Sequence, residues 1–190
     1  MTFSCWQFYP DKTENWAYVD NLFTPEECAQ IIAIGNSKLE KAKVVGGEAK
    51  KDIRESQISW LSSNDLEFAF RRVTDTVLNL NSQFFQFDLF GMAEGFQFTR
   101  YDAPTGHYGL HIDKILNSTV RKLSLTIQLS SPEDYEGGEL ALQLDKEADI
   151  MSKELGKMIV FPSYVLHEVR PVTKGTRYSL VAWVTGKPFK

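Results

Sequence analysis

Two stretches in the first half of the chain place apolar residues at helical spacing. In the first, Thr24 can cap a helix, Pro25 suits its first turn, and Glu27 completes a capping box. The second opens at residues 64–67, an Asn-Asp-Leu-Glu run. We expect each apolar stripe to be the core face of a helix that covers a sheet. The stripes consist of Cys28, Ile31, Ile32 and Leu39 in the first helix and of Leu66, Phe70, Val73, Val77 and Leu80 in the second.

The rest of the pattern predicts short strands separated by turn signals such as Pro104-Thr105-Gly106 and Lys174-Gly175. Many short strands at this spacing are typical of an antiparallel sandwich or barrel, so the fold is expected to be mainly β with flanking helices. The predicted strands cover residues 15–20, 41–46, 56–61, 95–101, 107–112, 121–130, 138–144, 157–161, 166–170 and 176–185.

Residues 123–129 alternate strictly between apolar and polar side chains. On a strand, alternate residues face opposite sides, so the apolar face can pack beneath the helices. The polar face either lies in solvent or lines a wet internal pocket, and the candidate site residues described next favour the pocket. The apolar face consists of Leu123, Leu125, Ile127 and Leu129, and the polar face of Ser124, Thr126 and Gln128.

A metal site is predicted by two histidines and one carboxylate. His111 and Asp113 are two positions apart, so on a strand both side chains point the same way. His167 must come from another strand. Two histidines and a carboxylate can occupy one face of an iron(II) ion and leave three positions open for substrate chemistry.

The last predicted strand places Arg177, Ser179 and Trp183 on one face. A buried arginine in this apolar strand would be costly without a partner. A bound dicarboxylate would supply that partner, because the planar guanidinium can grip a carboxylate with two hydrogen bonds. The combination indicates an iron oxygenase with an acidic co-substrate.

Each of these residues also has an ordinary explanation. His111 alone could be a hydrogen-bonded core histidine, and Arg177 alone could be a surface residue beside a turn. The shared strand faces and the order of the residues make that explanation improbable for all of them together. His107 lies on the same strand face as His111, but we favour a structural or pocket-rim role for it over a site with three histidines.

Composition fits one well-cored domain, because the 190 residues are 43% hydrophobic. We expect residues 1–190 to form that domain, with helical support over about 1–94 and the catalytic β core over about 95–186. A net charge of −4 and a pI of about 5.4 make nucleic acid an improbable partner, and the basic excess in residues 38–54 is typical of a solvated loop.

The N-terminal sequence has neither a basic segment nor a long apolar run, and no stretch is long enough to span a membrane. The two cysteines, Cys5 and Cys28, are then expected to be reduced thiols in a cytoplasmic protein, with Cys28 a small core residue. The sequence does not predict an oligomeric state.

Several motifs resemble the catalytic domain of prolyl 4-hydroxylases, which are iron(II)- and 2-oxoglutarate-dependent dioxygenases. The resemblance covers about residues 16–186 and implies a double-stranded β-helix, or jelly roll, with flanking helices. The motifs are Tyr101-x4-Gly106-x-Tyr108-x2-His111-x-Asp113, the turn Gly137-Gly138-Glu139-Leu140, His167-Glu168-Val169, Arg177-Tyr178, and the helix start at residues 20–28.

The resemblance implies a role for each matching position. His111, Asp113 and His167 become iron ligands, and Arg177 becomes the partner of the distal carboxylate of 2-oxoglutarate. Dioxygen is the second co-substrate, succinate and carbon dioxide are products, and ascorbate is expected to stimulate turnover. Collagen-type enzymes have lysine where this chain has Arg177, which places the chain nearer the oxygen-sensing type and bacterial or phage relatives. The further residues expected at the co-substrate pocket are Tyr101, Thr126, Gln128, Ser179 and Trp183.

The resemblance suggests a prolyl residue in a peptide or protein as substrate, with Arg54, Gln57 and Trp60 near the entrance. Residues 43–56 occupy the place where relatives carry a mobile loop that covers the substrate. Taken alone, Trp60 is better explained as a core residue than as a platform for a peptide.

Two other classes of function stay open. A related oxygenase could act on a free amino acid or on a nucleobase, because base-repair dioxygenases also combine these ligands with an Arg-x-Ser pair. A binding module that retained the fold without activity is the other class. Such modules usually lose a metal ligand or the arginine, and here all are present.

Overall fold

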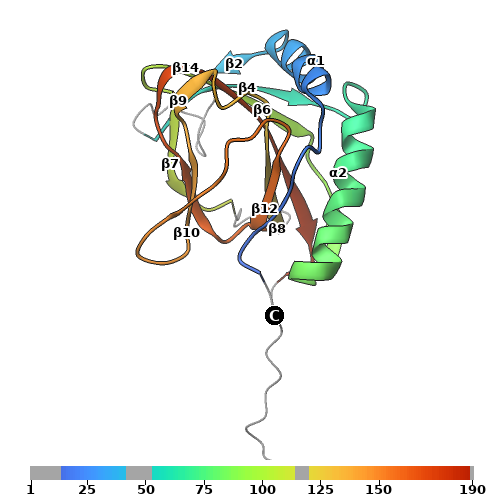
Figure 1. Cartoon of the computed structure of the whole chain (residues 1–190). Coiled ribbons are helices and arrows are strands. Elements are labelled where there is room, and N and C mark those ends of the chain that lie inside the picture. Colours follow the sequence, from blue (N-terminus) through green and yellow to red (C-terminus); the bar gives the residue numbers. More distant parts are fainter. Residues whose placement is uncertain (1–13, 42–52, 114–119, 189–190) are drawn as a thin grey trace, which may run out of the picture.

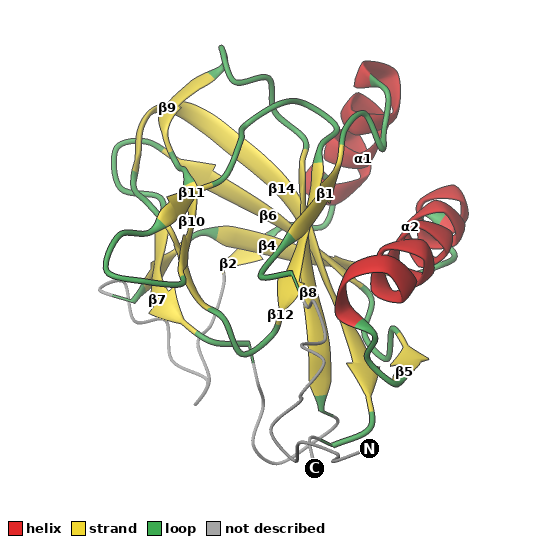
Figure 2. Ribbon diagram, turned by 60° about the horizontal axis from the view of Figure 1, so that its bottom comes forward, coloured by secondary structure: helices red, strands yellow, loops and turns green. Residues whose placement is uncertain are grey.

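The structure is a computed structural model that describes residues 14–41, 53–113 and 120–188. Two sheets face each other, and two helices cover the outer side of the main sheet (Figures 1 and 2). The helical segments are α1 (Pro25–Asn36), α2 (Glu67–Leu80) and the π-helical turn η1 (Asn81–Phe85).

The main sheet runs in the order β1 (Ala17–Val19), β12 (Met158–Pro162), β8 (Arg121–Gln128), β14 (Val172–Gly186), β6 (Phe96–Asp102), β4 (Gln57–Leu61) and β2 (Glu40–Lys41). Two short strands, β5 (Leu89–Gly91) and β9 (Tyr135–Gly137), also pair with β14. The minor sheet runs in the order β11 (Asp149–Ile150), β10 (Leu140–Gln143), β13 (Leu166–Val169), β7 (His107–His111) and β3 (Arg54–Glu55).

The chain alternates between the two sheets. Strands β7, β10 and β13 belong to the minor sheet, whereas β8, β12 and β14, which follow them in turn, belong to the main sheet. This winding is the double-stranded β-helix, and the predicted fold class is confirmed. The second half of the chain thereby brings residues far apart in sequence into the space between the sheets.

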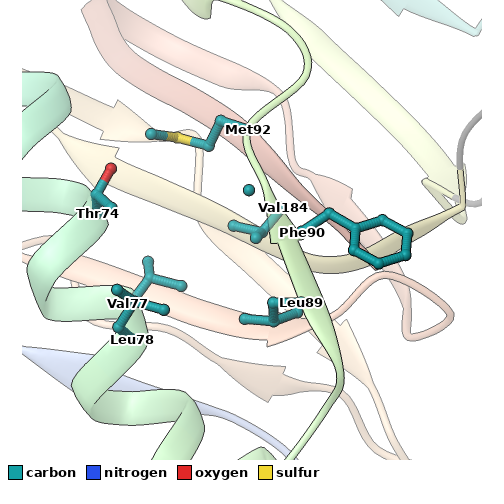
Figure 3. A pocket seen from close by; sticks show the side chains of 8 residues that line it. Thr74, Val77, Leu78, Leu89, Phe90, Met92 and Val184 are labelled. Atoms are coloured by element: carbon teal, nitrogen blue, oxygen red, sulfur yellow. The ribbon is translucent and has the colours of Figure 1, made fainter. Parts of the chain in front are cut away.

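The core has two parts that lie on opposite faces of the main sheet. One part packs the apolar sides of α1 and α2 against the sheet, and it includes Cys28, Val73 and Leu125. The other fills the space between the sheets and includes Tyr101 and Phe161. The helix side also holds an apolar cavity of about 160 Å³ between α2 and β5 (Figure 3). No helix in the described part of the chain is long and apolar enough to cross a membrane.

The predicted start of α1 is confirmed. The Glu27 backbone N–H donates to the Thr24 hydroxyl at 3.3 Å, and the Thr24 backbone N–H donates to the Glu27 carboxylate at 2.9 Å. Leu39 lies beyond the end of the helix at Asn36, so its assignment to the helical stripe was wrong. Cys28 is buried as predicted, and burial raises the pKa of its thiol to about 11.

The second helix begins at Glu67, later than the predicted start at residue 64. Asp65 explains the difference, because its carboxylate accepts hydrogen bonds from the backbone N–H and the hydroxyl of Ser62. These bonds hold a turn in front of the helix and do not cap it. Of the predicted strand at 41–46, Lys41 belongs to β2, and the rest lies outside the described residues.

We expect Gly35→Ala to destabilise the protein, although alanine normally favours a helix over glycine by about 1 kcal/mol. The helix α1 packs so closely on β6 that a methyl group on Gly35 would clash with the Phe98 ring. Overpacking of this kind costs about 1–3 kcal/mol of unfolding free energy. Urea unfolding of the variant measures the loss. A variant at least as stable as the wild type would show that α1 can move away from β6.

Candidate functional site

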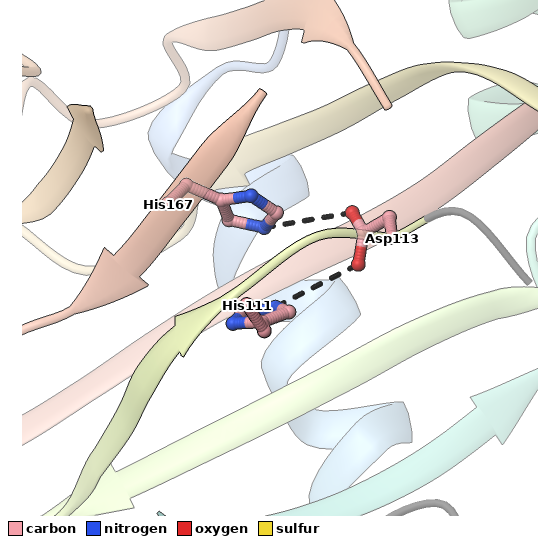
Figure 4. A group of neighbouring side chains, drawn as sticks. All are labelled: His111, Asp113 and His167. Carbon is pink, nitrogen blue, oxygen red and sulfur yellow. Dashed lines mark ion pairs between the residues drawn. The ribbon is translucent and has the colours of Figure 1, made fainter. Parts of the chain in front are cut away.

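The histidines of the predicted metal site lie opposite each other in the minor sheet. His111 ends β7, and His167 is its register partner on the adjacent strand β13. Both side chains point into the space between the sheets (Figure 4). The ring centroids of the two histidines are 4.2 Å apart. Antiparallel pairing therefore brings together two ligands that are far apart in sequence.

Asp113 completes the cluster from just beyond the end of β7, which agrees with the predicted strand over residues 107–112 to within one residue. Its backbone N–H donates to the Ser163 carbonyl at 3.1 Å, which fixes the chain at this point. Its carboxylate oxygens lie 3.6 Å from Nε2 of His111 and 3.5 Å from Nε2 of His167 (Figure 4). One ligand atom from each of the three residues lies within 4.8 Å of the others.

Backbone hydrogen bonds orient both imidazole rings. Nδ1 of His111 lies 2.7 Å from the Gly109 carbonyl, and Nδ1 of His167 lies 2.9 Å from the Val165 carbonyl. A carbonyl only accepts, so each Nδ1 carries the proton and each Nε2 presents a lone pair to the centre of the cluster. The carboxylate is oriented in the same way by the Ser124 hydroxyl, which donates to Asp113 at 2.7 Å.

The protonation states suit a metal ion. Burial and the neighbouring His167 lower the pKa of His111 to about 4, so its ring is neutral at neutral pH. Burial alone would raise the pKa of Asp113, but His167, His111 and the Ser124 hydroxyl outweigh it and the net shift is downward. Two imidazole nitrogens and one carboxylate form the donor set that non-haem iron(II) uses. Among the described residues, His107 is not part of this cluster, and its Nδ1 lies 2.7 Å from the Thr105 carbonyl.

Arg177 lies on β14, in the main sheet, and its side chain is 0% exposed. One Nη donates to Oε1 of the Gln128 side chain at 3.0 Å and the other to the Ser179 hydroxyl at 3.4 Å. Its guanidinium carbon is 5.4 Å from the centre of the Tyr101 ring. No carboxylate in the described part of the chain forms an ion pair with it, and its Nε has no hydrogen-bond partner there. A buried cation in this state fits an anionic ligand.

The polar face of β8 is buried, which confirms its predicted position in the interior. Every residue of β8 is buried, and the apolar face belongs to the core under the helices. In register, Gln128 lies opposite Ser179 and Ser124 opposite Trp183, while Arg177 lies opposite Tyr101 on the other side. The predicted co-substrate residues are thus brought together on one wall. The buried polar side chains on this wall are Gln97, Thr99, Ser124, Thr126, Gln128, Arg177 and Ser179.

Trp183 and Trp60 form an aromatic pair with ring centroids 6.1 Å apart. Trp183 is buried, but Trp60 is 42% exposed, so the expectation that Trp60 is a core residue was wrong. The guanidinium carbon of Arg121 lies 3.7 Å from the Trp183 ring centre, and the Asp113 carbonyl accepts a bond from Arg121 at 3.3 Å. Glu94 holds Arg121 through two short bonds, at 2.6 and 2.8 Å.

The other two candidate substrate residues differ in position. Arg54 is buried beside the cluster, where its guanidinium donates to Gln97 at 2.9 Å and lies 4.5 Å from the Tyr108 ring centre. Tyr108 in turn stacks on His111. Gln57 lies opposite Arg100 in register, on the helix side of the main sheet, so the structure does not bring it to the cluster. Of the predicted loop 43–56, residues 43–52 lie outside the described part.

Sequence reasoning missed several residues that the structure places at the site. Ser124 was assigned only to a polar face, although it binds Asp113 directly. Arg121 and Tyr135 were not singled out. Tyr135 is buried beside the Gly137-Gly138 turn that was singled out, and an aromatic residue before a double glycine was the available signal.

Solved structures with the same fold include prolyl hydroxylases. A prolyl hydroxylase from Trichoplax adhaerens, in complex with a peptide fragment of the hypoxia inducible factor oxygen degradation domain, superposes with a TM-score of 0.78 at 15% identity. The superposition covers 90% of this chain and 84% of the Trichoplax chain. A prolyl-4-hydroxylase from Pseudomonas putida gives a TM-score of 0.70 at 22% identity, covering 93% of this chain and 95% of its own. These likenesses show the fold.

Sequence comparisons show the family. A PKHD-type hydroxylase from Nitrosomonas europaea is 30% identical over 177 residues, which cover 87% of this chain and 76% of that protein. One from Gloeothece citriformis is 32% identical over 174 residues, with the same shares covered. The family model of the 2OG-Fe(II) oxygenase superfamily matches residues 96–185, which span the cluster and Arg177. The chain belongs to the 2OG-Fe(II) oxygenase superfamily.

Proposed function

We propose that the protein is an iron(II)- and 2-oxoglutarate-dependent dioxygenase that hydroxylates an unactivated C–H bond, with a prolyl residue in a peptide or protein as its substrate. The observation that carries this proposal is Arg177, a fully buried guanidinium with no anionic partner among the described residues. It lies between the same two sheets as a cluster suited to iron(II). A dianionic co-substrate could bind Arg177 with one carboxylate and reach the metal with the other end.

His111, Asp113 and His167 would hold the metal. With 2-oxoglutarate and dioxygen, iron(II) supplies oxidative decarboxylation of the co-substrate to succinate and carbon dioxide, coupled to hydroxylation of a C–H bond. The chain holds the metal and the co-substrate in position and keeps water away from them. The carbonyls of Gly109 and Val165 aim the Nε2 lone pairs, and Arg177 fixes the far end of the co-substrate.

Aromatic side chains exclude water from the cluster. The Phe161 ring packs edge-on against His167 with centroids 4.8 Å apart, and the Tyr108 ring stacks on His111 with centroids 3.6 Å apart. Trp183 closes the side next to Ser124. An apolar surround of this kind protects a strong oxidant from bulk water.

A polypeptide substrate is supported by the exposed Trp60 ring beside Trp183, which offers a flat apolar surface at the edge of the site. Tyrosine and tryptophan surfaces of this kind commonly bind peptides. The relatives support the same substrate class, because the Trichoplax enzyme was solved with a peptide and the Pseudomonas protein is a prolyl-4-hydroxylase. The acidic overall charge favours a polypeptide over a nucleobase in nucleic acid.

The substrate class is tested with the purified protein, iron(II), ascorbate, 2-oxoglutarate and a library of proline-containing peptides. We expect succinate release, and mass spectrometry should find a gain of one oxygen atom on proline. Succinate without any oxidised peptide would point to a free amino acid or a nucleobase as substrate. A protein that neither binds 2-oxoglutarate nor releases succinate would be a binding module.

We expect His167→Ala to lose stoichiometric binding of iron(II) and all turnover, because it removes one of three ligands from the cluster. Metal content by mass spectrometry and succinate release measure the two effects. His107→Ala is the matched control, since His107 lies on β7 outside the cluster and should keep both properties. Equal metal content in the two variants would refute the assignment of the ligands.

Arg177→Lys should raise the KM for 2-oxoglutarate roughly 10- to 100-fold, because lysine keeps the charge but loses the planar pair of donors. The kcat should fall less than the affinity. Arg177→Ala should leave almost no activity, because the distal carboxylate then has no cationic partner. Steady-state kinetics at saturating iron separate the two parameters. An unchanged KM in both variants would mean that the carboxylate binds elsewhere.

A further inference from the structure

Four buried side-chain atoms in the described part of the chain have no hydrogen-bond partner, and two of them belong to residues that pack against Gly138. These two are Nε of Arg177 and the hydroxyl of Tyr135. Tyr135 is 3% exposed and begins β9, which pairs with the first residues of β14, the strand that carries Arg177. A buried hydroxyl without a partner lowers the stability of a protein by about 1–3 kcal/mol, so a ligand that accepts a hydrogen bond from it would recover part of that loss.

The side chains of Arg177 and Tyr135 both pack on the backbone of Gly138. A methyl group there would lie 3.1 Å from Cδ of Arg177 and 3.2 Å from Cε2 of Tyr135. Gly138 also has a φ of +67°, a conformation that favours glycine. The double-glycine turn therefore sets the two side chains side by side.

Lys153 holds the Tyr135 ring from a second direction. Its Nζ lies 4.1 Å from the ring centre and donates to the Gly137 carbonyl at 3.0 Å. The ring is thus fixed by Gly138 and Lys153, and the direction of its C–O bond is fixed with it. A donor that is already in place loses little entropy when it binds a ligand.

The Tyr135 hydroxyl keeps its proton. Burial raises the pKa of this phenol, and the positive charge and close approach of the Arg177 side chain oppose the rise without cancelling it. At neutral pH the group can therefore donate a hydrogen bond to an anion. Arg177 also keeps a free donor, because its bonds to Gln128 and Ser179 use only the two Nη atoms.

We propose that Tyr135 binds the co-substrate directly, by donating a hydrogen bond from its hydroxyl to the distal carboxylate that Arg177 holds. This inference rests on the proposed function. Arg177 and Tyr135 together satisfy the carboxylate, and the carboxylate satisfies both atoms that lack partners. Tyr135 thus joins Arg177 in selecting a dicarboxylate over a 2-oxo acid without a second charge.

The test is Tyr135→Phe, which keeps the ring that packs on Gly138 and Lys153 and removes only the oxygen. Calorimetry on the Mn(II)-loaded, oxygen-free protein should show the Kd of 2-oxoglutarate raised about 10- to 100-fold, the usual effect of losing a hydrogen bond to a charged group. The Kd of Mn(II) should not change, and the Tm should not fall, because the variant removes a buried hydroxyl that has no hydrogen-bond partner among the described residues. The Kd of 2-oxopentanoate, which lacks the distal carboxylate, should stay within about twofold.

Tyr178→Phe is the matched control, because Tyr178 lies opposite Arg100 in register, on the helix side of β14, and should bind 2-oxoglutarate like the wild type. If the wild type binds 2-oxoglutarate and Tyr135→Phe binds it equally well, only the inference about Tyr135 fails. A parallel loss of Mn(II) affinity or of Tm would assign Tyr135 a structural role and would also overturn it. If the wild type itself does not bind 2-oxoglutarate, the proposed function fails as well.

Discussion

The geometry of the cluster formed by His111, Asp113 and His167 depends on the register in which β7 pairs with β13. This pairing sets His111 opposite His167, and a slip of β7 by one residue would turn the His111 ring to the outer face of the minor sheet, away from His167. Apolar burial fixes this register only in part. Tyr108 and Val169, the other register pair, pack in the core between the sheets, but Leu110 and Leu166, which neighbour the histidines, are exposed on the outer face. The two strands thus place histidine inside and leucine outside, the reverse of the usual pattern. Such a reversal is expected where a site, and not the core, decides which face is buried.

The main sheet separates two environments that the protein needs at the same time. On its helix side, Leu125 and Ile127 pack under α1 and α2, and this apolar contact can stabilise the fold without help from the site. On its inner side, Ser124 and Gln128 are buried at a cost that their hydrogen bonds offset only in part. One face of β8 is apolar and the other is polar. The apolar packing under the helices can therefore offset the free-energy cost of burying the polar side chains between the sheets.

Much of this arrangement could be predicted from the sequence. The capping box of α1 and the alternation of β8 are local patterns that the structure confirms, and the three candidate metal ligands lie together in it. The errors concern features that only tertiary contacts decide. Asp65 was taken as part of a helix start, but it binds Ser62 in a turn. Trp60 was expected in the core, yet no neighbour covers it fully, and the unpartnered hydroxyl of Tyr135 depends on the packing of β9 against β14.

The charges of the described residues explain why the site should bind a metal and an anion together. Arg177 and Arg54 are both buried, and neither forms an ion pair with a carboxylate in the described part of the chain, whereas Arg121 is neutralised by Glu94. The described residues therefore leave two buried cations without a carboxylate partner, and a divalent metal would add to that positive charge. A dianion bound between the metal and Arg177 would offset the positive charge of each. Binding of the metal and binding of the anion should therefore favour each other. The same imbalance disfavours a neutral ligand at the Arg177 end, because such a ligand would displace water from a buried cation without replacing its interactions.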